Sequence, residues 1–158
     1  DKKLFTYVTK NSEKILRREI TSIKNILRAS VRIKLSIVKK DGKESLRHKG
    51  ASRMLLNYGH TVGHALELLS GYRLPHGEAV SIGMVAENRV AVGKKILKEM
   101  EALRILELLK RLGLPTKIPH EYSPEQIKRA MGMDKKQIGG KLYFALPIKI
   151  GAARVIAL

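Results

Sequence analysis

Residues 53–70 read RMLLNYGHTVGHALELLS, and this stretch decides the fold because it predicts a buried helix. Apolar residues fall on nearly every side of the expected helix, which is the pattern of a helix inside a core. Gly59 and Gly63 stand four residues apart within it, although each glycine in a helix costs about 1 kcal/mol relative to alanine. We therefore expect these two glycines to mark a close approach, either by another helix or by a ligand.

Four polar residues repeat along the same predicted helix. They are Arg53, Asn57, His60 and His64, whose offsets of four, three and four place them on one helical face. Polar groups in an apolar helix are costly unless they are satisfied, and a polar ligand with a metal ion would satisfy all four. The guanidinium of Arg53 suits a phosphate or carboxylate, and the amide of Asn57 suits hydroxyl groups. Two plainer interpretations stay open: core histidines that bond to backbone, and an arginine that simply lies on the surface.

A further histidine, His76, follows beyond a turn and just ahead of the next predicted helix. Histidines from two segments can hold one divalent cation, usually with a carboxylate as the third ligand of a catalytic site. The sequence from His60 to His64 lacks the glutamate of the His-Glu-x-x-His zinc motif, so this pair by itself is weak evidence. The start of the helix near Gly77 would also offer free backbone N–H groups to an anion.

The rest of the chain is predicted to be mainly helical, with a small β element at its end. A polar, basic loop is expected over residues 39–52, and Gly139-Gly140 is expected to form a turn. Further helices are expected over residues 12–38, as one long helix or two stacked ones, and over residues 79–97, 99–112 and 123–131. Two short strands are expected over residues 141–148 and 153–158, joined at Gly151. Because no repeat or linker divides the chain, residues 1–158 are predicted to form a single domain.

Composition narrows the class of protein. The chain has 158 residues, 44% of them hydrophobic and 29% charged, as in a globular domain with a sizeable core. No apolar run approaches the ~20 residues that cross a bilayer, and the chain starts at Asp1 without a signal peptide. We therefore expect a cytoplasmic chain without a membrane partner, and the start without methionine suggests a piece of a longer one. The absence of cysteine excludes disulfides, a thiolate nucleophile and cysteine-ligated metal sites.

A formal net charge of +18 first suggests a nucleic-acid partner, because lysine and arginine displace counterions from phosphates. Only 4% of the residues are aromatic and none is tryptophan, so the chain offers a poor platform for stacking bases. No nucleic-acid-binding motif is present either. A site for a small anionic substrate, with the remaining charge on solvated surface, explains the excess without nucleic acid.

Two segments together closely resemble 3-dehydroquinate synthase, a family within the sugar-phosphate cyclase superfamily. They are LNYGHTVGHALE at residues 56–67 and HGEAVSIGM at residues 76–84. The resemblance covers essentially the whole chain, and its other landmarks are Lys34 to Val38 with Asp41 and Glu44, Gly113-Leu114-Pro115, Met133 to Lys136 and the closing strand near Gly151. It implies a two-domain enzyme of which this chain is only the mainly helical C-terminal domain. The N-terminal α/β domain, which binds NAD in that family, is then absent from this chain.

The resemblance also implies roles for individual residues. His60 and His76 match two histidines that hold a divalent metal, zinc or cobalt. The third ligand of the family is a glutamate in an Ala-Glu segment upstream, with no counterpart here. His64 matches a histidine that handles protons during catalysis. Substrate-contacting positions of the family are matched by Lys34, Arg53, Asn57 and one of Lys135 and Lys136.

One departure from the family pattern lies between Glu44 and Arg53, where residues 45–52 are extra. This insertion leaves the alignment of Lys34 less secure than that of the histidines. Arg47 becomes a rival of Arg53, but Arg53 keeps the four-residue offset to Asn57.

The activity that the resemblance implies is a phosphorus–oxygen lyase reaction of the shikimate pathway, which leads to chorismate and the aromatic amino acids. The enzyme converts 3-deoxy-D-arabino-heptulosonate 7-phosphate into 3-dehydroquinate and phosphate, and NAD takes a hydride and later returns it. The full-length enzyme is expected to be a homodimer, and the isolated chain to be inactive or nearly so. Two alternatives remain: a sibling cyclase of the inosose or valiolone synthase type, and a basic helical nucleic-acid-binding module.

Overall fold

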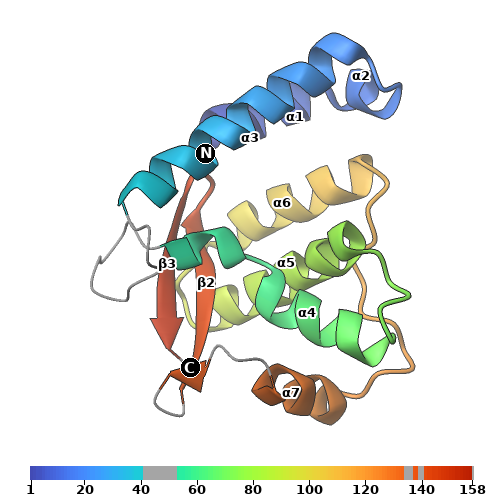
Figure 1. Ribbon diagram of the computed structural model, residues 1–158, viewed down its shortest axis with the longest axis vertical. Coiled ribbons are helices and arrows are strands. Elements are labelled where there is room, and N and C mark those ends of the chain that lie inside the picture. Colours follow the sequence, from blue (N-terminus) through green and yellow to red (C-terminus); the bar gives the residue numbers. More distant parts are fainter. Residues whose placement is uncertain (41–52, 134–136, 139–140, 158) are drawn as a thin grey trace.

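The computed structural model describes residues 1–40, 53–133, 137–138 and 141–157. The extra residues 45–52, the Gly139-Gly140 turn and the candidate substrate residues Lys135 and Lys136 lie outside these ranges. Helices precede a small antiparallel sheet at the end of the chain (Figure 1). The helices are α1 (Lys2–Lys10), α2 (Ser12–Leu16), α3 (Ile20–Lys40), the 3-10 helix η1 (Arg53–Asn57), α4 (His60–Leu69), α5 (His76–Gly93), α6 (Glu99–Arg111) and α7 (Pro124–Met133), and the strands are β1 (Gln137–Ile138), β2 (Lys141–Lys149) and β3 (Ala152–Ala157). The fold class predicted from the sequence, mainly helical with a small terminal β element, is confirmed.

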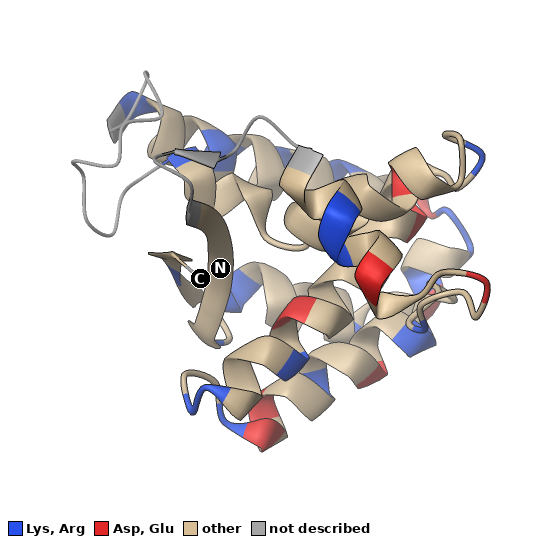
Figure 2. Ribbon diagram, turned by 90° about the horizontal axis from the view of Figure 1, so that it is seen from below, with Lys and Arg blue, Asp and Glu red and all other residues tan. Residues whose placement is uncertain are grey.

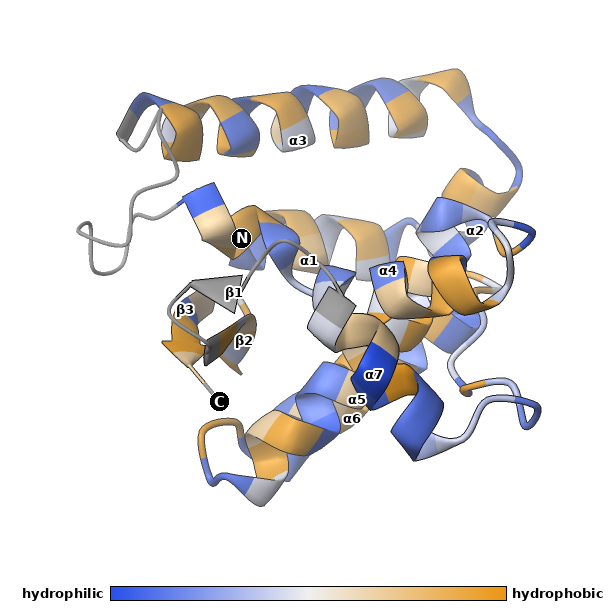
Figure 3. Cartoon of the chain, turned by 60° about the horizontal axis from the view of Figure 1, so that its bottom comes forward, coloured by the Kyte–Doolittle hydropathy of each residue, from blue (hydrophilic) through white to orange (hydrophobic). Residues whose placement is uncertain are grey.

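The first three helices form an arm at one end of the molecule (Figure 1). The helical pattern expected over residues 12–38 is two helices, because the chain turns between α2 and α3, where Arg18 has a φ of 57°. A further helix, α1, precedes them, and the Asp1 carboxylate caps it by accepting a hydrogen bond from the Leu4 N–H at 2.8 Å. The hydropathy colours of Figure 3 alternate along α3, and part of its apolar surface is exposed. The exposed apolar side chains of α3 are Ile20, Leu27, Val31 and Leu35.

Helices α4 and α5 pack against each other at the centre of the molecule, and glycines allow their close approach. A Cβ atom on Gly63 would lie 3.2 Å from backbone atoms of Ala79 and Val80 on α5. A Cβ atom on Gly83 of α5 would collide with the Gly59 carbonyl group. The close approach predicted from Gly59 and Gly63 is therefore confirmed, and the partner is a helix.

The single helix predicted over residues 53–70 is wrong. The chain forms η1, passes through Gly59 in the left-handed conformation with a φ of 78°, and then begins α4 at His60. A positive φ is inexpensive only for glycine, and it breaks the helical path at this point. Arg53 and Asn57 consequently do not share a continuous helical face with His60 and His64, and the single face predicted from their offsets is wrong.

The antiparallel sheet and the remaining helices agree closely with the predicted elements. Strands β2 and β3 pair from Tyr143 opposite Ala157 to Lys149 opposite Ala152, with an irregularity between Pro147 and Lys149. Helix α6 begins at Glu99 as predicted, whereas α5 begins at His76, three residues earlier than predicted. The main core lies where α4, α5, α7 and β2 meet, and its buried members are Val62, Ala65, Leu66, Ile82, Ala91, Leu97, Ile127, Ala130, Phe144 and Leu146.

Among the described residues, no helix combines the length and the apolar character that crossing a bilayer requires. Figure 2 shows lysine and arginine spread over many elements of the ribbon. The balance of charge is most uneven in α3, which has no acidic residue. Its basic residues are Lys24, Arg28, Arg32, Lys34, Lys39 and Lys40.

Candidate metal centre

Three histidine side chains meet where α4 begins and α5 begins. The ring centroid of His60 lies 5.3 Å from that of His64 and 5.2 Å from that of His76. The rings of His64 and His76 are 6.0 Å apart. The sequence suggested that these two segments could share one cation, and their histidines do lie close together in the structure.

The two helices place these rings for simple geometric reasons. His60 is the first residue of α4, and His64 lies one turn later on the same side. His76 is the first residue of α5, and the glycine contact between the helices brings it against α4. The His76 side chain is 58% exposed, whereas His60 and His64 are half-buried, so the cluster is open to solvent on the His76 side.

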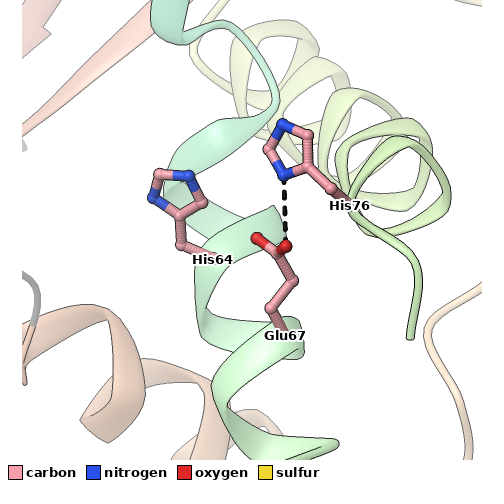
Figure 4. Close-up of side chains that lie close together, drawn as sticks. All are labelled: His64, Glu67 and His76. Atoms are coloured by element: carbon pink, nitrogen blue, oxygen red, sulfur yellow. Dashed lines mark hydrogen bonds and ion pairs between the residues drawn. The ribbon is translucent and has the colours of Figure 1, made fainter. Parts of the chain in front are cut away.

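A carboxylate completes the cluster. The Nδ1 atom of His76 lies 3.1 Å from Oε1 of Glu67, whose side chain is only 14% exposed (Figure 4). One ligand atom each of His64, Glu67 and His76 lies within 4.8 Å of the others. Sequence reasoning did not single out Glu67, although it stands three residues after His64 and therefore on the same helical face.

His60 has a backbone partner of its own. Its Nδ1 atom lies 3.0 Å from the carbonyl oxygen of Tyr58. When Nδ1 carries the proton, it donates to this carbonyl, and Nε2 then bears the lone pair that a metal requires. Metal-bound histidines commonly use the second ring nitrogen in this way, on a carbonyl or a carboxylate.

The donor set fits a divalent transition metal. Imidazole nitrogens and a carboxylate are the ligands of catalytic zinc sites, and imidazole also suits cobalt. Two imidazoles bound tetrahedrally at the usual metal–nitrogen distance place their ring centroids roughly 5 Å apart. The separations of 5.2 Å between His60 and His76 and of 5.3 Å between His60 and His64 both match this value.

The segment that carries His60 is held from α5. The Glu87 side chain, fully buried, accepts hydrogen bonds from the backbone N–H groups of Gly59, Thr61 and Val62 at 2.7, 3.1 and 3.3 Å. The Tyr58 hydroxyl donates to Oδ1 of Asn88 at 2.6 Å. Burial raises the pKa of Tyr58, so its hydroxyl stays protonated and remains a donor. Sequence reasoning missed both Glu87 and Asn88.

Three of the predicted substrate residues lie on η1 and α3. Arg53, exposed, and Asn57, half-buried, are the first and last residues of η1, which leads into the Gly59 turn. Lys34 is exposed on α3, and α3 packs against η1. Their roles, like the division of labour among the three histidines, stay predictions.

Fold and site together define a mainly helical domain with a histidine–carboxylate cluster of the kind that holds a divalent metal. Residues 1–137 match a family model, that of the 3-dehydroquinate synthase C-terminal region. The chain belongs to this family, as the resemblance of the two histidine segments implied.

Curated relatives agree with the family match. The chain is 41% identical over 152 residues to 3-dehydroquinate synthase of Desulforamulus reducens, which covers 96% of this chain and 41% of the relative. It is 44% identical over 142 residues to 3-dehydroquinate synthase of Pyrococcus abyssi, covering 90% of this chain and 38% of the relative. The chain thus spans about two fifths of the length of the relatives that it matches.

Two solved structures share this fold. The 2-epi-5-epi-valiolone synthase of Streptomyces hygroscopicus subsp. jinggangensis, with NAD+ and Zn2+ bound, has a TM-score of 0.81 and 24% identity, covering 99% of this chain and 42% of the other. A 2-deoxy-scyllo-inosose synthase complexed with carbaglucose-6-phosphate, NAD+ and Co2+ has a TM-score of 0.59 and 25% identity, covering 67% of this chain and 32% of the other.

Proposed function

We propose that this chain is the metal- and substrate-binding part of a cytoplasmic 3-dehydroquinate synthase. The full enzyme converts 3-deoxy-D-arabino-heptulosonate 7-phosphate into 3-dehydroquinate and phosphate. The observation that carries the proposal is the convergence of His60, His64 and His76 with Glu67 at the α4–α5 junction. The 3-dehydroquinate synthases that match at 41 and 44% identity favour this substrate over those of the sibling cyclases, which match at 24 and 25%. Membership of this family gives no support to the nucleic-acid-binding alternative.

His60 and His76 are the proposed metal ligands in this chain. Each of them has its Nδ1 atom next to an acceptor, the Tyr58 carbonyl for His60 and the Glu67 carboxylate for His76. Nε2 of each ring is the proposed metal ligand, and Glu67 is proposed to orient His76 instead of binding the metal. The set His64, Glu67 and His76 is the second candidate, because its ligand atoms also lie close together.

The roles proposed for the other residues follow from the charges of the substrate, which carries a phosphate and a carboxylate. Arg53, Lys34 and one of Lys135 and Lys136 would supply positive charge for these groups, and Asn57 would bind hydroxyls. His64, next to both proposed ligands, would receive and return protons, since imidazole changes its charge near neutral pH. When bound, the metal supplies Lewis acidity toward the hydroxyl that is oxidised, and NAD supplies the hydride chemistry.

The chain spans about two fifths of the length of its relatives. We propose that the α/β domain that holds NAD in this family, and the upstream glutamate ligand, belong to the rest of the full-length enzyme. A site with two protein ligands binds a metal weakly, so we propose that the isolated chain is inactive or nearly so. The full-length enzyme is proposed to be a homodimer.

The test is an assay of the full-length enzyme with NAD and Zn2+ or Co2+, in which released phosphate is measured. We expect turnover with the heptulosonate phosphate and little with sedoheptulose 7-phosphate or glucose 6-phosphate. Preference for either of the latter would assign the chain to a sibling cyclase. The isolated chain serves as the second arm, and clear turnover by it would contradict the proposed need for the missing domain.

A further inference from the structure

A buried carboxylate on α5 lies outside the roles assigned so far. Glu87 is fully buried, eleven residues after His76 on the same helix. Burying an ionisable carboxylate is costly unless hydrogen bonds compensate for lost water. Glu87 has such bonds: its Oε2 accepts from the Gly59 N–H, and its Oε1 accepts from the N–H groups of Thr61 and Val62.

These three donors form the N-terminus of α4. The first backbone N–H groups of a helix have no partner within the helix, and a side chain at the capping position normally accepts from them. The capping position of α4 is Gly59, which has no side chain and makes no capping bond of its own. Glu87 therefore acts as a cap that is supplied by the neighbouring helix, and its negative charge suits a helix N-terminus.

The next residue of α5 holds the preceding part of the same segment. Asn88, also buried, accepts the hydrogen bond of the Tyr58 hydroxyl at 2.6 Å. The Tyr58 carbonyl in turn lies 3.0 Å from Nδ1 of His60. Two adjacent residues of α5 thus fix the chain on both sides of His60, and His64 follows one helical turn later.

The same helix begins with His76, so α5 supplies both one of the histidines and the groups that hold the other two in place. We propose that Glu87 and Asn88 are a positioning pair for the histidine cluster. They fix the register of α4 against α5, and with it the separation between the rings of His60 and His76. This inference deepens the proposed function and rests on it, because the register matters for catalysis only if the histidines serve a shared metal.

The central test replaces Glu87 by glutamine in the full-length protein. Glutamine keeps one acceptor oxygen but turns an NH2 group toward backbone N–H donors, so it cannot satisfy both sides of the Gly59–Val62 segment. We expect Co2+ affinity to fall by about 10–100-fold, as is usual when a group that orients metal ligands is lost. The affinity is measured by titrating metal-free protein and following the visible absorption of bound Co2+.

The matched control is Glu101→Gln. Glu101 also accepts a backbone hydrogen bond with its carboxylate, from the Ile150 N–H at 2.6 Å, but it belongs to α6 and not to the α4–α5 junction. We expect this variant to keep wild-type Co2+ affinity and an unchanged absorption spectrum. If Glu101→Gln loses as much affinity as Glu87→Gln, or if Glu87→Gln loses none, the positioning role is refuted.

A crystal structure of the metal-free Glu87→Gln protein separates this inference from the proposed function. We expect the His60 ring to move away from the 5.2 Å separation from His76, while α5 keeps its path. Unchanged ring separations would overturn the inference whatever the metal does. Failure of the wild-type protein to bind Co2+ would instead overturn the proposed metal centre. The crystal structure of the Glu87→Gln protein would then decide alone whether Glu87 and Asn88 position the histidines.

Tyr58→Phe provides a milder variant if Glu87→Gln does not yield folded protein. It removes only the hydroxyl that bonds to Asn88 and keeps the ring. We expect a several-fold loss of Co2+ affinity with a changed absorption spectrum, because the Tyr58 carbonyl that contacts His60 would no longer be fixed from α5. Wild-type affinity and spectrum in this variant would contradict the part assigned to Asn88.

Discussion

His76 and Glu67 face each other across the α4–α5 junction, with Nδ1 of His76 3.1 Å from Oε1 of Glu67. A carboxylate at this place can have one of two roles. It either orients the imidazole, whose Nε2 then binds the metal, or it binds the metal itself together with His64 and His76. His60 shows the same arrangement, with its Nδ1 atom next to the Tyr58 carbonyl, and this parallel favours the first alternative.

Glu67→Gln in the full-length protein distinguishes these two alternatives. Glutamine can still accept a hydrogen bond from His76 but lacks the charge, so an orienting role predicts Co2+ affinity lower by about 10–100-fold with a similar absorption spectrum. A ligand role predicts near-complete loss of binding and an altered spectrum. The control is Glu107→Gln, an exposed glutamate paired with Lys110 on α6, which should leave affinity unchanged.

Gly83→Ala should destabilise the protein strongly. The added Cβ atom would collide with the Gly59 carbonyl, a backbone group that cannot rotate away. Overpacking of this kind costs about 1–3 kcal/mol, and the variant should unfold at a lower urea concentration. Gly93→Ala, in the same helix but with no atom within 4 Å of its new Cβ, is the control and should be neutral or slightly stabilising. Equal stability of the two variants would argue against the close α4–α5 contact.

The cap of α7 gives a prediction about pH. Ser123 and Gln126 bond reciprocally, with the Gln126 N–H donating to Ser123 Oγ at 3.2 Å and the Ser123 N–H donating to Gln126 Oε1 at 2.8 Å. Hydrogen bonds from its own backbone N–H and from Ser123 lower the pKa of Glu125. A lowered folded-state pKa means that the charged form of Glu125 stabilises α7 above its unfolded-state pKa, and that this contribution is lost as pH falls through the folded-state value.

Ser123→Ala should therefore raise the pKa of Glu125 toward its ordinary value, because the variant lacks the hydroxyl that donates to this carboxylate. The measurement is an NMR titration of the glutamate side-chain carboxyl carbons, with Glu99 of α6 as the internal reference. An unchanged Glu125 titration in the variant would show that Ser123 has no part in the shift.

The sequence was sufficient to predict features that local patterns encode. Two glycines four residues apart in an apolar stretch predicted a close approach by a helix or a ligand, because each glycine costs helix stability, and the structure shows that the neighbour is α5. Two short strands joined at Gly151 were predicted at the end of the chain, and α6 was predicted from an amphipathic pattern that starts at Glu99 and ends at Gly113. The convergence of three histidines was predicted from their spacing and from the family resemblance, and the geometry agrees.

Features that depend on contacts across the fold were not predictable in this way. The break at Gly59 depends on a left-handed backbone, which the surrounding apolar pattern conceals. Glu87 reads in the sequence as an ordinary helical glutamate, and its role exists only because residues 28 positions earlier fold back onto it. Glu67 is similar, since its partner His76 comes from the next helix.

His60→Ala and His64→Ala should separate metal binding from proton transfer in the full-length enzyme. His60 is a proposed ligand, so its alanine variant should lose Zn2+ or Co2+ during dialysis and lose turnover with it. His64 is proposed to handle protons, so its variant should retain metal near the wild-type content while turnover falls by about 10²–10⁴-fold. Metal content is measured by atomic emission and turnover by phosphate release. His120, exposed and on a different segment, gives the control variant His120→Ala, which should match wild type in both measurements. The opposite result, with metal lost from the His64 variant and kept by the His60 variant, would assign the metal to His64, Glu67 and His76.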